Sequence, residues 1–155
     1  MSVAEKLVAL LKAQGLTCAT AESCTGGGVG SAITAVPGSS AVFAGGIISY
    51  SNDVKQDVLG VSADILQNVG AVSAETAAQM AEGARKLLKV DLAVSLTGIA
   101  GPDGGSEEKP VGLVWFGLAT KDGVRTEKAI FRGDRARVRE QAVVHALGML
   151  TIGAT

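Results

Sequence analysis

Two apolar runs of this sequence lead directly into glycine-rich segments, and this feature constrains the fold most. Residues 16–21 are apolar and partly β-branched, which predicts a strand, and they lead into residues 21–28, AESCTGGG. Residues 91–97 resemble a buried strand and lead into residues 98–110, a long loop rich in glycine. The pattern predicts strands inside a covered sheet, with candidate functional turns at their ends.

Apolar residues at helical spacing predict helices between these strands. Val3, Leu7, Leu10 and Leu11 share one face of a first helix, and Gly15 ends it. Shorter helices are expected over residues 27–35, over residues 52–59 with Asn52 or Asp53 as the cap, and over residues 63–68 with Ser62 as the cap. Ser73 and Asp134 cap two longer helices, whose inward residues are predicted to be Ala77, Met80, Ala81, Ala84, Leu87 and Leu88 in one, and Val138, Ala142, Ala146 and Met149 in the other.

Three further strands complete the expected fold. Residues 41–51 form one, in which Gly45 and Gly46 indicate a bulge or a close backbone approach. Residues 111–120 and 124–131 form a hairpin around Lys121-Asp122-Gly123. The order α-β-α-β-α-α-α-β-β-β-α predicts an α/β fold with α+β character: one three-layer domain over residues 1–155, with helices on a mixed sheet and a C-terminal β-hairpin followed by a helix. Strands and helices do not alternate strictly, which argues against a standard doubly wound fold.

Composition excludes several classes of function. The chain has 155 residues and a net charge of -1, so it has no basic excess for binding nucleic acid. Its apolar runs are too short for a membrane span, and its first residues do not resemble a signal peptide. The two cysteines, Cys18 and Cys24, are too few for a disulfide framework. We therefore expect a cytoplasmic protein with reduced thiols.

Ser23 is the first candidate for chemistry, because it lies on the turn between a strand and a helix. A small nucleophile is exposed at such a turn, and backbone N–H groups freed by the glycines could hold an oxyanion or a phosphate. The same residues also fit a simple helix cap followed by a closely packed, glycine-rich helix. No lysine follows the glycines, so the segment is not a Walker motif.

A serine nucleophile needs a base, and the sequence offers few. The single histidine, His145, lies seven residues after Val138 on the apolar face of the last helix, which favours a core histidine with its hydrogen bonds satisfied. Lysine is the other known partner of serine in compact hydrolases. Cys24 could itself be the nucleophile, but no histidine partner is evident and an inert thiol is favoured.

Tyr50 and Lys55 form the second candidate. Tyr50 ends a predicted strand and Lys55 follows about one turn into the next helix, so both side chains could reach the strand end that carries Ser23. A desolvated lysine can accept the serine proton, and a tyrosine hydroxyl can relay or donate one. From these residues alone, a helix cap with a solvated lysine is the favoured interpretation.

The glycine loop and an arginine cluster could surround a ligand. Residues 97–105, TGIAGPDGG, could present N–H donors to an anion, and Asp103 has no partner at metal-ligand spacing, so no metal and no cofactor are expected. Arg135 and Arg139 share a face of the last helix and could clamp a phosphate, whereas Arg137 fits a solvated face. The residues predicted to bind substrate are Thr25, Gly26, Gly27, Thr97, Gly98, Ala100, Gly101, Arg132 and Arg135.

Five segments in this order resemble the C-terminal domain family of the competence/damage-inducible protein CinA. The segments are residues 21–27 (AESCTGG), 46–52 (GIISYSN) with Lys55, 97–105 (TGIAGPDGG), 110–112 (PVG) and 131–135 (FRGDR). The resemblance implies a nicotinamide-nucleotide amidase, which converts nicotinamide mononucleotide and water into nicotinate mononucleotide and ammonia. It also implies a serine nucleophile assisted by a lysine and a tyrosine, which are Ser23, Lys55 and Tyr50 here.

Two hypotheses follow from the sequence. In the first, the chain is the stand-alone form of this amidase, with a nucleotide as its small-molecule partner. In the second, it is a non-catalytic module that binds a nucleotide or docks to a partner, as the relation to competence proteins would allow. Alanine-rich helices and an apolar hairpin could pair with a second copy, so a homo-oligomer is also expected.

Overall fold

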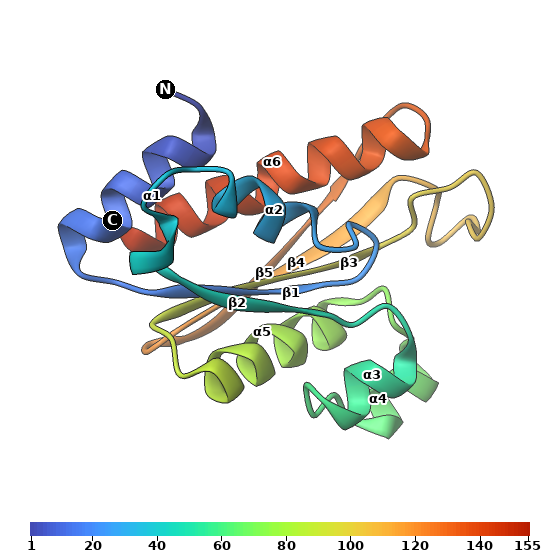
Figure 1. Cartoon of the computed structure of the whole chain (residues 1–155). Helices are drawn as coiled ribbons and strands as arrows, with labels where there is room; N and C mark the ends of the chain where they lie inside the picture. The colour runs from blue at the N-terminus through green and yellow to red at the C-terminus, as the bar shows by residue number, and fades with distance from the viewer.

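A mixed five-stranded sheet forms the centre of the computed structural model, which describes residues 1–155 (Figure 1). The strand order is β2-β1-β3-β4-β5. β1 pairs in parallel with both β2 and β3, whereas β4 is antiparallel to β3 and to β5. The strands are β1 (Cys18–Glu22), β2 (Phe43–Ile48), β3 (Leu92–Gly98), β4 (Leu113–Thr120) and β5 (Gly123–Ile130).

Helices cover both faces of this sheet, so the domain has three layers as predicted (Figure 1). On one face lie α1 (Val3–Gln14), α2 (Gly28–Thr34) and α6 (Arg135–Ala154). On the other lies α5 (Ala74–Leu88), with α3 (Asn52–Asp57) and α4 (Ala63–Asn68) beside it. A 3₁₀ turn spans Ser39–Ala41. No helix has both the length and the hydropathy that crossing a bilayer requires.

The two faces have separate hydrophobic cores, which explains why every residue of β1 is buried. Cys18 packs into the larger core under α1, α2 and α6, whereas Ala19 and Ala21 pack into a smaller core with Met80 and Ala84 of α5. Successive residues of a strand point to opposite faces, so a strand covered on both sides is buried at every position, and the polar residues Thr20 and Glu22 of β1 also lie in the interior.

Local signals placed most elements correctly. Gly15 ends α1 in the left-handed conformation, and the side chains of Ser62, Ser73 and Asp134 cap α4, α5 and α6. Two expectations were wrong. α3 ends at Asp57 and is capped by Ser51, whose hydroxyl accepts the Val54 N–H at 3.2 Å. Leu87 is 52% exposed, because the buried stripe of α5 continues to Leu88 and Leu87 lies about 100° away around the helix.

Gly45 and Gly46 mark both a bulge and a close approach. The pairing of β1 with β2 slips by one residue beside Gly45, so Cys18 pairs with Phe43 and Ala19 with Gly45. A Cβ on Gly46 would collide with the hydroxyl of Thr20. Strand β2 is shorter than predicted and stops at Ile48, so residues 49–51 are free to form the turn that leads to the site.

Candidate active site

The candidate site lies where the three parallel strands end. Ser23 follows β1, Tyr50 lies just beyond β2, and Thr97 and Gly98 end β3. Because these strands run in the same direction, their carboxyl ends meet at one edge of the sheet, the usual ligand position in such folds. A cavity of about 270 Å³ opens there, and eight of the residues predicted from sequence line it: Ser23, Tyr50, Lys55, Thr97, Gly98, Ala100, Gly101 and Arg135.

Lys55 and Ser23 are in direct contact at the base of this cavity. Lys55 Nζ lies 3.1 Å from Ser23 Oγ, 2.7 Å from the Ser49 carbonyl and 3.0 Å from the Tyr50 carbonyl. The lysine comes from α3 and is only 1% exposed, and the serine is 7% exposed. The alternative of a solvated lysine is therefore wrong.

Burial lowers the pKa of Lys55 below its ordinary value of 10.5, although the nearby Cys24 acts in the opposite direction. A neutral amine has two N–H donors and one lone pair. The two carbonyls of residues 49 and 50 can take both donors, and this arrangement would leave the lone pair for the hydroxyl proton of Ser23. The geometry therefore suits a lysine that acts as a base.

A buried carboxylate, Glu22, shapes the turn beside Ser23. Its Oε1 accepts the Thr25 hydroxyl at 2.6 Å and the Val29 N–H at 2.9 Å, and its Oε2 accepts the Gly30 N–H at 3.0 Å. Glu22 thus satisfies the start of α2, where Gly27 has no side chain to serve as a cap. The N–H groups of Val29 and Gly30 are already used and are not open to a phosphate.

Three residues predicted to bind substrate form this turn and do not line the cavity. The Thr25 hydroxyl is bound by Glu22, and Gly26 and Gly27 adopt positive φ values of 58° and 102°. These angles suit glycine, so the residues set the shape of the turn between β1 and α2.

The glycine loop forms the opposite wall of the cavity. Gly98, Ala100 and Gly101 line it, and Nη1 of Arg135 donates to the Gly101 carbonyl at 2.7 Å. Arg135 also lines the cavity, whereas Arg132 is exposed and does not. The arginine cluster at the start of α6 is thus divided between the site and solvent.

Sequence reasoning missed part of this wall. Ala71 and Val72 line the cavity and lie outside every segment singled out from sequence. Asn52, Asp103 and Gly104 also line it; they belong to candidate segments but were not predicted to bind substrate. The Thr97 hydroxyl donates to the Ala71 carbonyl at 2.8 Å and so holds that segment against the end of β3. The only local signal was the turn Asn68-Val69-Gly70 before the Ser73 cap, which does not reveal its neighbour in space.

The two other candidate catalytic groups are held in inert surroundings. His145 Nε2 lies 2.8 Å from a Glu127 carboxylate oxygen and its ring centroid is 4.3 Å from that of Phe116, so it makes structural contacts, although its side chain is 32% exposed and not in the core as predicted. Burial raises the pKa of the Cys24 thiol to about 11 and that of Cys18 to about 12. Both thiols are therefore protonated near neutral pH, in agreement with the inert thiol predicted for Cys24.

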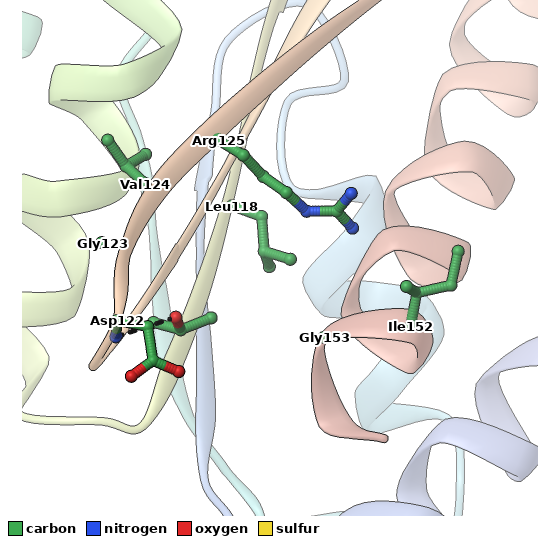
Figure 2. Close-up of a pocket in the computed structure, with 8 residues that line it drawn as sticks. Leu118, Asp122, Gly123, Val124, Arg125, Ile152 and Gly153 are labelled. Carbon is green, nitrogen blue, oxygen red and sulfur yellow. Dashed lines mark hydrogen bonds between the residues drawn. The ribbon is translucent and has the colours of Figure 1, made fainter.

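A second hollow lies at the other end of the sheet (Figure 2). It has a volume of about 300 Å³ between the β4–β5 turn and the last turn of α6, with Leu118, Asp122, Arg125 and Ile152 in its lining. Ala119 pairs with Ala93 near the start of β3, so this hollow is at the opposite edge of the sheet from Ser23. It shares no residue with the Ser23–Lys55 cavity.

The fold and the site together place this protein among α/β domains that hold a buried serine–lysine pair at the ends of parallel strands. The comparisons then identify its family: the model of the CinA C-terminal domain matches residues 1–152, and the chain belongs to that family. The nicotinamide-nucleotide amidohydrolase PncC of Escherichia coli is 51% identical over 97% of this chain and 92% of its own length. A competence/damage inducible protein from Agrobacterium tumefaciens has a solved structure that superposes with a TM-score of 0.94 at 44% identity, over 98% of this chain and 93% of that chain.

Other relatives are longer proteins. A CinA-like protein of Parasynechococcus marenigrum is 52% identical over 96% of this chain, which corresponds to 36% of that relative. The chain thus spans about a third of the length of the CinA-like protein and of two similar relatives that are named competence-damage inducible proteins. The relatives therefore include both short amidohydrolases and longer proteins.

Proposed function

We propose that this protein is a nicotinamide-nucleotide amidohydrolase that converts nicotinamide mononucleotide and water into nicotinate mononucleotide and ammonia. The observation that carries the proposal is the 3.1 Å contact between Ser23 Oγ and Lys55 Nζ inside the cavity. The similarity to PncC, which extends over nearly the whole of both chains, supports the choice of substrate. The unit proposed to act is the whole domain, residues 1–155.

The proposed reaction is serine–lysine acyl transfer. Neutral Lys55 takes the hydroxyl proton of Ser23 while Oγ attacks the carboxamide carbon. Lys55 then returns this proton to the amide nitrogen as the C–N bond breaks, so ammonia leaves and an ester to Ser23 remains. Lys55 next takes a proton from water, which attacks the ester, and then gives that proton to Ser23 Oγ as the acid is released. Tyr50, which lines the cavity, assists by a hydrogen bond from its hydroxyl to the leaving nitrogen and keeps its own proton.

Two backbone N–H groups next to the nucleophile are suited to the oxyanion. Those of Cys24 and Thr25 donate to no carbonyl or side-chain oxygen of the chain, whereas the Gly26 N–H donates to the Ser23 carbonyl at 3.1 Å. We assign Cys24 and Thr25 as the oxyanion donors, because N–H groups that follow the nucleophile lie close to the oxygen that becomes negative.

The remaining wall is proposed to bind the nucleotide. Arg135 is the cation in the cavity lining that can pair with the phosphate, and Thr97, Gly98, Ala100 and Gly101 contact the rest of the substrate. Arg132 lies outside the lining, so its role is limited to attraction of the anionic substrate over a longer range. Gly26 and Gly27 contribute through the shape of the Ser23 turn, and Thr25 contributes through its backbone N–H.

We also propose a cytoplasmic location and self-association. Two buried free cysteines suit a reducing compartment. β5 is at an edge of the sheet, and the exposed side chains of Ile130, Val144 and Ile152 on β5 and α6 provide apolar surface near that edge for a second copy.

Ammonia release from nicotinamide mononucleotide tests the proposed function. We expect steady turnover by the wild type and a loss of at least about 10³-fold in Ser23→Ala, because the nucleophile is removed. Ser31→Ala is the matched control, since Ser31 is an exposed serine on the adjacent helix α2. Equal rates in the wild type and Ser23→Ala would overturn the mechanism. Calorimetric binding of the nucleotide without turnover would instead indicate a non-catalytic binding module.

A further inference from the structure

Arg139 of α6 binds the backbone of the turn that carries Ser23. Its Nε donates to the Cys24 carbonyl at 3.0 Å, and its Nη2 donates to the Thr25 carbonyl at 3.2 Å. Two successive carbonyls are thus held by one planar guanidinium, whose donors form a rigid fork. The contact fixes the direction of two peptide groups relative to α6.

The orientation of these two peptide groups determines where the N–H groups proposed to hold the oxyanion point. A trans peptide is planar, so its C=O and N–H point in opposite directions. The bond from Arg139 to the Cys24 carbonyl therefore sets the direction of the Thr25 N–H, which belongs to the same peptide. Arg139 influences the Cys24 N–H less directly. Its bond to the Thr25 carbonyl orients the Gly26 N–H, which belongs to the same peptide and donates to the Ser23 carbonyl. The Ser23 carbonyl in turn shares its peptide with the Cys24 N–H.

The two carbonyls differ in how much they depend on Arg139. The Thr25 carbonyl also accepts the Gly28 N–H at 3.0 Å, so it keeps one partner without the arginine. The Cys24 carbonyl accepts from Arg139 alone. Loss of the guanidinium would therefore free the peptide between Cys24 and Thr25 to rotate, while Glu22 still holds the start of α2.

We propose that Arg139 is a positioning residue that aims the backbone N–H groups of Cys24 and Thr25 at the oxyanion formed during amide hydrolysis. This role rests on the proposed function, because it requires the carboxamide to be attacked by Ser23. It differs from the role of Arg135, which lines the cavity itself, since Arg139 acts only through the backbone of the turn.

Arg139→Met tests the proposal, because methionine keeps the apolar stem and removes the fork. We expect kcat to fall about 10- to 100-fold with KM changed less than about twofold, since oxyanion donors act in the transition state and not on the bound amide. Arg139→Lys, which can hold one carbonyl at a time, should lose less. Arg137→Met is the matched control: Arg137 is exposed on the same helix and its side chain makes no hydrogen bond.

A second readout separates this role from general support of the fold. An aldehyde analogue of nicotinamide mononucleotide, with a formyl group in place of the carboxamide, would form a tetrahedral adduct with Ser23 and so need the same N–H donors. Its affinity should fall by the same factor as kcat in Arg139→Met. Binding of the true substrate, measured in a Ser23→Ala background, should be unchanged, and a merely structural role would weaken both.

The outcomes distinguish this proposal from the proposed function. Wild-type protein that releases no ammonia overturns the proposed function, and the role of Arg139 with it. Active wild type with Arg139→Met equal to Arg137→Met, or with undiminished aldehyde affinity, overturns only the role of Arg139. Should Arg139→Met fail to fold, as judged by circular dichroism, the same comparisons are made with Arg139→Lys, and wild-type kcat and aldehyde affinity in that variant overturn the proposal.

Discussion

The two walls of the cavity are built differently. Ser23 and Lys55 form a buried wall, 7% and 1% exposed, and side chains from β1, α3 and α6 hold its atoms at hydrogen-bond distance. The other wall consists of residues 98–101, 103 and 104 of the glycine loop and the side chain of Tyr50, which is 64% exposed. Its one side-chain anchor to α6 is the bond from Arg135 to the Gly101 carbonyl.

This difference separates two tasks of one site. Bond-making requires the reacting atoms to be held within fractions of an ångström, which a buried, hydrogen-bonded wall provides. A nucleotide must enter and leave, which a more exposed wall of backbone and glycine allows. Changes in the buried wall should therefore act mainly on kcat, and changes in the open wall mainly on KM.

Lys55→Met should have the largest effect, because it removes the base from the buried wall and keeps an unbranched side chain of similar reach. We expect kcat to fall by at least about 10³-fold. In the wild type, kcat/KM should rise with pH as the lysine loses its proton, with a midpoint below 10.5, because burial lowers its pKa. Rates measured from pH 6 to pH 10 test both points.

The stability of the same variant provides an independent control. A lowered pKa in the folded state means that the unfolded chain binds more protons between the folded value and 10.5. The free energy of unfolding contributed by Lys55 must therefore rise with pH across that window and be lowest below it. Urea titrations should show this rise in the wild type and not in Lys55→Met. The same slope in both proteins would contradict the lowered pKa.

Much of the fold could be predicted from sequence, because its signals are local. Gly15, Ser62, Ser73 and Asp134 mark helix ends through their own geometry, and these predictions were confirmed. The order of the elements and the C-terminal hairpin followed in the same way. The exposure of Leu87 was missed because helical spacing alone does not show where the packed stripe ends.

The site was predictable only in part, because its contacts join distant segments. Short sequence spacing suggested that Tyr50 and Lys55 could approach Ser23, but the burial of the lysine depends on how α3 packs. The tyrosine reaches the lysine through its backbone carbonyl, which no side-chain pattern reveals. The roles of Glu22 and Arg139 required the three-dimensional path of α2 and α6 around the Ser23 turn.

Arg135→Gln should have the next largest effect and tests the open wall. Removing its positive charge from the cavity lining should raise KM for the nucleotide about 10- to 100-fold, with kcat lowered only a few-fold, because phosphate binding contributes nearly equally to the bound and transition states. Arg132→Gln should raise KM less, since Arg132 is outside the lining. Steady-state kinetics at constant ionic strength measures both variants.

The effects of Arg135→Gln and Arg132→Gln on kcat and KM show whether the loop wall serves binding or bond-making. A loss in Arg135→Gln that falls on kcat alone would show that the loop wall takes part in bond-making, and the comparison between the walls would then fail. Arg137→Gln, on the solvated side of α6, controls for the loss of one positive charge.

Cys24→Ala should have the smallest effect, although Cys24 adjoins the nucleophile on the buried wall. Burial raises the pKa of its thiol to about 11, so only about 0.1% would be thiolate at pH 8. Its proposed contribution is its backbone N–H, which alanine keeps, so we expect kcat and KM within about threefold of the wild type. The wild type should likewise resist inactivation by iodoacetamide at pH 8. The opposite result would be rapid inactivation that the nucleotide prevents, together with an inactive Cys24→Ala. It would show that the nucleophile is the thiol of Cys24 and not the hydroxyl of Ser23, and that Lys55 takes its proton from sulfur rather than from oxygen.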